Sequence, residues 1–205
     1  MKENKYDDNI FFQKYSQMSR SQQGLAGAGE WETLRKLLPD FKDKRVLDLG
    51  CGYGWHCIYA MEHGASSVVG VDISHKMLEV AKEKTHFPQV EYKCCAIEDV
   101  EFPEESFDVI LSSLAFHYVA DYEILVKKIY RILKSGGKLV FTVEHPVFTA
   151  YGTQDWHYNE KGEILHFPVD NYYYEGKRTA VFLGEKVTKY HRTCLLYTSD
   201  AADDK

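Results

Sequence analysis

Between residues 45 and 143 the chain alternates short β-branched runs with amphipathic or turn-like stretches, and this alternation restricts the fold more than any other feature. Strands that alternate with helices form βαβ units on a parallel sheet. We therefore expect an α/β fold with a doubly wound, Rossmann-like sheet. The runs that we expect to form strands are 45–49, 67–72, 90–94, 107–113 and 138–143.

The first of these runs leads into the motif VLDLGCGYG at residues 46–54. Glycines lack Cβ, so a ligand can touch the backbone of such a turn. Dinucleotide-binding loops have the spacing GxGxxG, whereas Gly50, Gly52 and Gly54 give GxGxG with Asp48 in front. A carboxylate repels a pyrophosphate and attracts a ligand that carries an ammonium and a sulfonium. The motif therefore favours a cationic ligand over a dinucleotide.

A second acidic residue, Asp72, ends the run at 67–72. In doubly wound folds an acidic side chain at this point accepts hydrogen bonds from ribose hydroxyls. Asp72 could instead cap the next helix, because Ser74 follows it closely. With the glycine turn nearby, ribose binding is favoured, and the ligand is expected to contain adenosine.

Four segments in order, VLDLGCGYG, VVGVDIS, FDVILSS and ILKSGGKLVFT, resemble the motifs of class I S-adenosylmethionine-dependent methyltransferases over about residues 45–143. The resemblance implies that S-adenosyl-L-methionine is the cofactor and that a methyl group passes to a small-molecule acceptor by in-line displacement. It also implies the sheet order 3-2-1-4-5-(7)-6, and the last strands are expected to be missing from this chain.

The resemblance also assigns cofactor-binding residues. It implies that Asp48 lies near the amino group of the methionine part and that Asp72 and Ile73 bind the ribose and adenine side. Ala96 stands where the family often has an aspartate, so only backbone contacts to adenine are expected there. The implied cofactor-binding set is Asp48, Gly50, Cys51, Gly52, Asp72, Ile73, Ala96, Ile97, Ser112 and Ser113.

Three further side chains are candidates outside these motifs. His117 follows the run at 107–113 and is the candidate catalytic residue, because a neutral histidine can remove a proton from the acceptor. A core or helix-start histidine is the alternative. Tyr15 and Arg20 are expected to close over the methionine carboxylate, for which a guanidinium is a natural partner. A solvated N-terminal arm is the alternative for both.

These patterns divide the chain into four parts. We expect an N-terminal helical segment covering the cofactor site at 1–44, the S-adenosylmethionine-binding core at 45–145, an aromatic-rich insertion or lid with the start of strand six at 146–193, and a non-native tail at 194–205. The tail resembles the translation of a transposase adapter used in DNA library preparation. A genuine disordered tail is the alternative.

Composition limits the partners. The 25 Lys and Arg residues against 31 Asp and Glu residues give a net charge of −6, and no basic stretch could neutralise a row of phosphates. We expect no nucleic-acid partner. Apolar runs are only strand-length and the first residues are polar, so we expect no membrane span, no signal peptide and a cytoplasmic protein. The five cysteines lack CxxC spacing, which predicts free thiols and no metal site.

Two other functions remain open at this point. One is an NAD-dependent oxidoreductase, which the glycine spacing and Asp48 disfavour. The other is a methyltransferase-like protein that binds the nucleoside without catalysis, since a fold does not fix a function. The sequence leaves the acceptor, the atom that is methylated and the oligomeric state undetermined.

Overall fold

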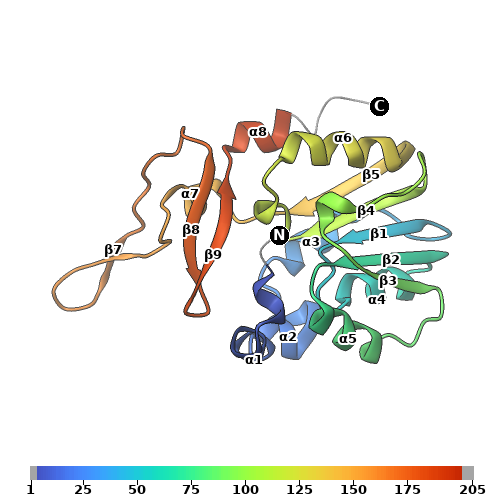
Figure 1. Ribbon diagram of the computed structural model, residues 1–205, viewed down its shortest axis with the longest axis horizontal. Helices are drawn as coiled ribbons and strands as arrows, with labels where there is room; N and C mark the ends of the chain where they lie inside the picture. The colour runs from blue at the N-terminus through green and yellow to red at the C-terminus, as the bar shows by residue number, and fades with distance from the viewer. Residues whose placement is uncertain (1–3, 200–205) are drawn as a thin grey trace.

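The computed structural model describes residues 4–199, and its centre is a five-stranded parallel sheet with helices on both faces (Figure 1). The strands of this sheet are β1 (Arg45–Leu49), β2 (Ser67–Asp72), β3 (Val90–Cys94), β4 (Phe107–Ser113) and β5 (Leu133–Thr142). The helices that connect or cover them are α3 (Trp31–Leu37), α4 (Trp55–Glu62), α5 (His75–Lys84) and α6 (Tyr122–Ile132), with short 3-10 turns η3 (Ile97–Asp99) and η4 (Phe116–Tyr118).

The strand order is β3-β2-β1-β4-β5, which confirms the predicted doubly wound sheet. Figure 1 shows β5 at the top of the sheet and β3 at the bottom. The predicted bounds of the first four strands are correct. The fifth strand begins at Leu133 rather than at 138, because its pairing with β4 shifts register between Phe107 and Val109. Gly136, with a φ of 72°, allows the chain to bend there without leaving the strand.

Alternate residues of each strand face two apolar layers, as a sheet covered on both faces requires. Leu47, Val69 and Ile110 pack in one layer with buried residues of α6. Val46 and Val68, one position away, pack in the other layer with Cys57 and Ala60 of α4 and Leu78 of α5. The two layers hold the carboxyl ends of β1, β2 and β4 in fixed positions beside one another.

The chain after β5 forms α7 (Pro146–Ala150), two antiparallel strand pairs and α8 (Cys194–Ser199). The pairs are β6 (His157–Tyr158) with β7 (Ile164–His166), and β8 (Gly176–Phe182) with β9 (Glu185–His191). The start of strand six that we expected in 146–193 is therefore a separate hairpin. The physical reason is its turn, where Leu183 and Gly184 have φ values of 53° and 80°, so β8 and β9 satisfy each other's backbone groups.

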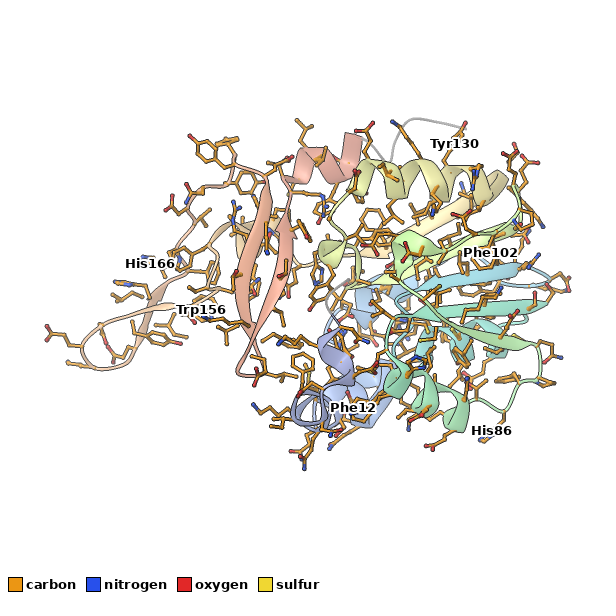
Figure 2. The ribbon with its side chains drawn as sticks, in the orientation of Figure 1. Phe12, His86, Phe102, Tyr130, Trp156 and His166 are labelled. Atoms are coloured by element: carbon orange, nitrogen blue, oxygen red, sulfur yellow. The ribbon has the colours of Figure 1, made fainter. Side chains whose placement is uncertain are left out.

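The aromatic-rich arm between α7 and β8 projects away from the sheet. Figure 2 shows Trp156 and His166 on this arm, at the far side of the hairpin from β1 to β5. Tyr173 is 87% exposed. The arm therefore lies outside the region that the strand ends enclose.

The N-terminal segment crosses the carboxyl side of the sheet as η1 (Lys5–Asp7), α1 (Asn9–Ser16), α2 (Ser19–Gln23) and η2 (Gly24–Gly27). Asp8 caps α1, because its Oδ1 accepts hydrogen bonds from the backbone N–H of Ile10 and Phe11. Asp7 binds the start of α5, accepting from Ser74 Oγ at 2.6 Å and Lys76 N at 3.1 Å. The segment is thus tied across the sheet at the end of β2.

Within the tail predicted at 194–205, the described residues form α8, whose Tyr197 packs on Tyr122 with ring centroids 5.2 Å apart. Residues 200–205 lie outside the described part. In residues 4–199, no helix is both long and apolar enough to cross a bilayer.

Candidate functional site

A cavity of about 720 Å³ opens at the carboxyl ends of β1, β2 and β4. This volume is typical of sites that enclose a small organic ligand. Of the residues predicted from the sequence, those that line it are Tyr15, Arg20, Gly50, Gly52, Asp72, Ile73, Ala96, Ile97, Ser113 and His117. The structure therefore brings together residues that lie up to about a hundred positions apart in the chain.

The turn after β1 exposes its backbone to this cavity. Gly50 N and Cys51 N donate to Val71 O at 2.8 and 2.9 Å, which holds the turn against the end of β2. Gly50 has a φ of 80°, and a Cβ there would overlap Ala115. Gly52 has a φ of 53°, and a Cβ there would meet no protein atom within 4 Å. The space above Gly52 is a bare-backbone cradle that a ligand can fill.

Asp72 connects this turn to β2 and α5. Its Oδ2 accepts from Gly52 N and its Oδ1 from Ser74 N, each at 2.9 Å. Burial raises the pKa of Asp72 to about 6, although these backbone donors act to lower it. Each carboxylate oxygen can accept a second hydrogen bond, so hydroxyl donors on a ligand in the cavity could still bind Asp72.

Asp48 is placed differently from the sequence prediction. It is only 1% exposed and does not line the cavity, because it lies beneath the turn with its Oδ2 accepting from Cys57 Sγ at 3.4 Å. Its Oδ1 is buried without a partner among the described residues. Burial raises the pKa of Asp48 to about 7. The carboxylate therefore supports the turn from below and reaches a ligand only through its electric field.

Two other residues that were predicted to contact the cofactor also do not line the cavity. Cys51 is 6% exposed and packs in the apolar layer with α4, because its side chain points away from the exposed face of the turn. Ser112 is 2% exposed, and its Oγ donates to Leu49 O at 2.8 Å. Both residues hold β1 and β4 in place beneath the cavity.

Arg20 and Tyr15 line the cavity as predicted, but Arg20 already has a partner. Its Nη2 donates to both carboxylate oxygens of Glu30, at 2.5 and 2.7 Å. Ser113 Oγ donates to the same carboxylate at 3.3 Å. The sequence analysis missed Glu30, which lies in a polar segment with no motif to mark it. A ligand carboxylate would meet the guanidinium together with this ion pair.

His117 lies in η4, at the end of the cavity that Glu144 and the hairpin line. The backbone N–H of Glu144 faces His117 Nδ1 at 3.5 Å. Burial lowers the pKa of His117 to about 4, so the ring is neutral near neutral pH. The carboxylate of Glu144 accepts from Lys189 Nζ at 2.5 Å and from Gln154 Nε2 at 2.8 Å.

The hairpin β8–β9 closes this end of the cavity, and the sequence analysis missed its contribution. The lining residues from the hairpin are Lys177, Phe182, Val187, Thr188 and Tyr190. No alternation of apolar residues marks β9 in the sequence, because two of its three buried residues are Lys189 and His191. None of the aromatics between Trp156 and Tyr174 lines the cavity, so the roof comes from the hairpin and the N-terminal segment.

Comparisons with known proteins agree with this geometry. A family described as "Methyltransferase domain" matches residues 47–141. A crystal structure of a putative S-adenosylmethionine-dependent methyltransferase from Listeria monocytogenes is 55% identical and covers 84% of this chain and 81% of its own, with a TM-score of 0.81. The chain belongs to the S-adenosylmethionine-dependent methyltransferases. Its cofactor is S-adenosylmethionine, and the alternative of an NAD-dependent oxidoreductase is not favoured.

Two further relatives extend this result. A crystal structure of an S-adenosylmethionine-dependent methyltransferase from Mesorhizobium loti is 39% identical, covers 87% of this chain and 81% of its own, and has a TM-score of 0.80. Ubiquinone biosynthesis O-methyltransferase from Coxiella burnetii is 36% identical over 54% of this chain. The chain spans only 47% of that relative, which is less than half of its length.

Proposed function

We propose that this methyltransferase binds S-adenosylmethionine against the turn at Gly50 and Gly52 and transfers the methyl group to a small molecule under the hairpin. The observation that carries the proposal is the carboxylate of Asp72, which holds Gly52 N and faces the same cavity as the bare backbone of the turn. When bound, S-adenosylmethionine supplies an electrophilic methyl group on a sulfonium.

The residues around the turn fit such a cofactor. The cradle above Gly52 has room for part of the cofactor. The buried carboxylates Asp48 and Asp72 favour a positive charge nearby. Ile73, Ala96 and Ile97 form an apolar wall beside Asp72 that would hold a flat base. Tyr15 and the Arg20–Glu30 pair would contact the amino-acid part.

The enclosed shape of the other half supports a small acceptor. The cavity is roofed by β8 and β9 on one side and by η1 and α1 on the other, where Phe11 packs on Phe182 with ring centroids 5.7 Å apart. His117 would lie next to the reacting atoms and position them, since alignment of donor and acceptor is most of what methyl transfer requires. The ubiquinone enzyme named above supports a small-molecule acceptor.

The ribose contact is tested by calorimetry with S-adenosylmethionine and its demethylated product, S-adenosylhomocysteine. We expect micromolar binding, about −8 kcal/mol, and a loss of about a hundredfold in Asp72→Ala, since both the ribose contact and the tie to Gly52 are removed. Asp155→Ala, at an exposed carboxylate on the projecting arm, is the matched control. Equal affinity in the wild type and in Asp72→Ala would refute the assigned contact.

A further inference from the structure

The hairpin end of the cavity is lined by His117, Glu144 and the five hairpin residues named above. Glu144 is the one carboxylate that the described residues place there. Each of its oxygens already accepts one hydrogen bond, one from Lys189 Nζ and the other from Gln154 Nε2. The Lys189 side chain is only 2% exposed and lies against this carboxylate, so its ammonium offsets the negative charge that a ligand would meet.

The orientation of His117 adds a further donor. A backbone N–H can only donate, so the N–H of Glu144 that faces Nδ1 favours the tautomer in which Nδ1 is bare and Nε2 carries the proton. The 3.5 Å contact is long for a hydrogen bond, but the opposite tautomer would place two N–H groups against each other. Nε2 has no hydrogen-bond partner among the described residues, and His117 lines the cavity, so a ligand there can accept from this N–H.

Three other polar side chains lie at this end. Lys177, whose side chain is exposed at the rim, has no ion-pair partner in the described part of the chain. Tyr190 and Thr188 present hydroxyls, and Phe182 and Val187 form an apolar wall between them. The other carboxylates that line the cavity, Asp72 and Glu98, lie at or after the ends of β2 and β3. The hairpin end therefore presents a lysine at its rim, two hydroxyls and a ring N–H around a carboxylate that is already paired with a lysine.

We infer that the methyl acceptor is a carboxylate on a flat, apolar body, and that His117 positions it by donating from Nε2 to the oxygen. This inference rests on the proposed function. The lone pair of the carboxylate oxygen forms the new C–O bond, and the C–S bond breaks with its electron pair remaining on sulfur. An oxygen that is already ionised has no proton to lose. His117 is then a hydrogen-bond donor rather than the general base that its position after β4 indicated.

The tautomer can be measured directly. Long-range ¹H–¹⁵N spectra of the labelled protein distinguish a protonated from a bare ring nitrogen, and His117→Gln identifies the His117 signals by their loss. We expect Nε2 to carry the proton and Nδ1 to be bare at neutral pH. A ring protonated at Nδ1, or at both nitrogens, would overturn the assignment.

The substrate class is tested with three probes of one shape: benzoate, benzamide and benzylamine. Their binding to protein saturated with S-adenosylhomocysteine is followed by ligand-observed NMR. We expect benzoate to bind at least about tenfold more tightly than either other probe, which is the scale of one charge-assisted hydrogen bond. Equal affinities, tighter benzylamine binding or no benzoate binding would each contradict the inference.

Variants separate a donor from a base. Glutamine can donate from a similar position but cannot take up a proton, whereas leucine can do neither. We expect His117→Gln to keep benzoate affinity within about threefold and His117→Leu to lose about tenfold. Lys177→Ala should weaken benzoate by about threefold, and Lys161→Ala, on the distant arm, should have no effect. Equal losses in the glutamine and leucine variants would remove His117 as the donor.

Calorimetry of the unmodified protein with S-adenosylhomocysteine keeps the two proposals apart. If S-adenosylhomocysteine binds but benzoate does not, the carboxylate inference fails and the proposed function stands. If S-adenosylhomocysteine itself does not bind, both fail.

Discussion

Gly52 and Gly54, two residues apart, both have left-handed backbone conformations. A Cβ added at each, however, would meet different surroundings. A Cβ on Gly52 would point into the empty cradle, whereas a Cβ on Gly54 would overlap Tyr92 Oη, which is hydrogen-bonded to Thr85. The first glycine therefore leaves open space beside the cavity, and the second leaves space for the packing of α4 and α5 against β3.

The two glycines should separate binding from folding. Gly52→Ala is expected to cost about 1 kcal/mol of stability, from its positive φ alone, and to weaken S-adenosylhomocysteine about tenfold by filling the cradle. Gly54→Ala is expected to cost about 2 kcal/mol or more, because strain and overlap add. Thermal unfolding and calorimetry measure the two effects. A Gly52→Ala protein with normal cofactor affinity would show that the cradle is not the binding surface.

Asp48 makes stability depend on pH in an unusual direction. Its pKa rises from 3.8 in the unfolded chain to about 7 in the folded protein, because burial penalises the charged carboxylate. The folded state therefore holds more protons between these two pH values. The stabilisation is complete below about pH 4 and is lost as the pH rises through about 7.

Removing this carboxylate should flatten that dependence. Between about pH 5 and about pH 8, the free energy of unfolding of the wild type should fall relative to Asp48→Asn by about 1 to 4 kcal/mol, at about 1.4 kcal/mol per pH unit. Urea unfolding of both proteins at the two pH values measures it. Asp72, the half-buried His56 and the buried His117 titrate in both proteins, so the difference between the two profiles reports on Asp48. Parallel pH profiles would mean that Asp48 does not titrate in this range.

Individual residues show where prediction from sequence succeeded and where it could not. Asp72 and the glycines were predicted because a motif fixes their place at a strand end. Asp48 was assigned to the ligand for the same reason. Which face of β1 its side chain takes, however, depends on packing with Cys57 nine residues later. Glu30 and Lys189 had no local signal, because their partners are set only by the folded chain.

At the level of elements, hydrophobic periodicity predicted the core sheet and its helices but not what covers it. β1 to β4 were predicted with correct bounds. In β1, β2 and β4 the signal is a mostly apolar run, whereas β3 alternates apolar and polar residues. The early start of β5 and the hairpin's independence from the sheet depend on pairing between distant residues. Periodicity within a window does not report such pairing.

Arg192, the residue after β9, is one of the contacts that hold the hairpin against the core. It is 5% exposed and donates to the carbonyl oxygens of Val119 at 2.5 Å, Ala120 at 3.0 Å and Phe116 at 3.4 Å. These carbonyls belong to η4 and the residues after it, next to His117. One planar guanidinium therefore links the end of the hairpin to three carbonyls beside the candidate substrate site.

A lysine in this place cannot reach all three oxygens. We expect Arg192→Lys to lower the free energy of unfolding by about 2 kcal/mol, and hydrogen exchange at residues 116–120 to accelerate. Arg131→Lys, at an exposed arginine 3.4 Å from Glu101, is the matched control and should change little. Unchanged exchange at 116–120 in Arg192→Lys would mean that other contacts hold the hairpin.

At the scale of the whole molecule, the N-terminal segment closes the side of the cavity next to Asp72, and it is hydrogen-bonded to the start of α5. Asp7 accepts from Ser74 Oγ and from the backbone of Lys76, next to Asp72 and Ile73. Asn4 Nδ2 adds a hydrogen bond to Ile73 O at 3.2 Å. Opening the cavity at this side requires these bonds to break.

Loss of the hydrogen bonds of Asp7 should change the release rate of S-adenosylhomocysteine more than it changes the stability of the fold. Asp7→Ala is expected to cost about 1 kcal/mol, as for a lost helix cap, and to speed the release of S-adenosylhomocysteine about fivefold or more. Stopped-flow displacement measures the release. Asp40→Ala removes a comparable hydrogen bond, to Lys42 N at 3.0 Å, in a turn away from the cavity and serves as the control. Equal release rates in all three proteins would exclude control of exit by this segment.

The roof of the cavity joins two stretches from opposite parts of the chain, since Phe11 packs on Phe182 and Lys14 Nζ donates to Leu183 O. Contacts so distant in sequence are the slowest to form, because a long loop must close first. During synthesis the parallel sheet can assemble before residue 182 is available, while the roof cannot. The newly made protein would thus pass through a stage in which the glycine turn is finished but uncovered, and the pocket becomes selective only when the last contacts arrive.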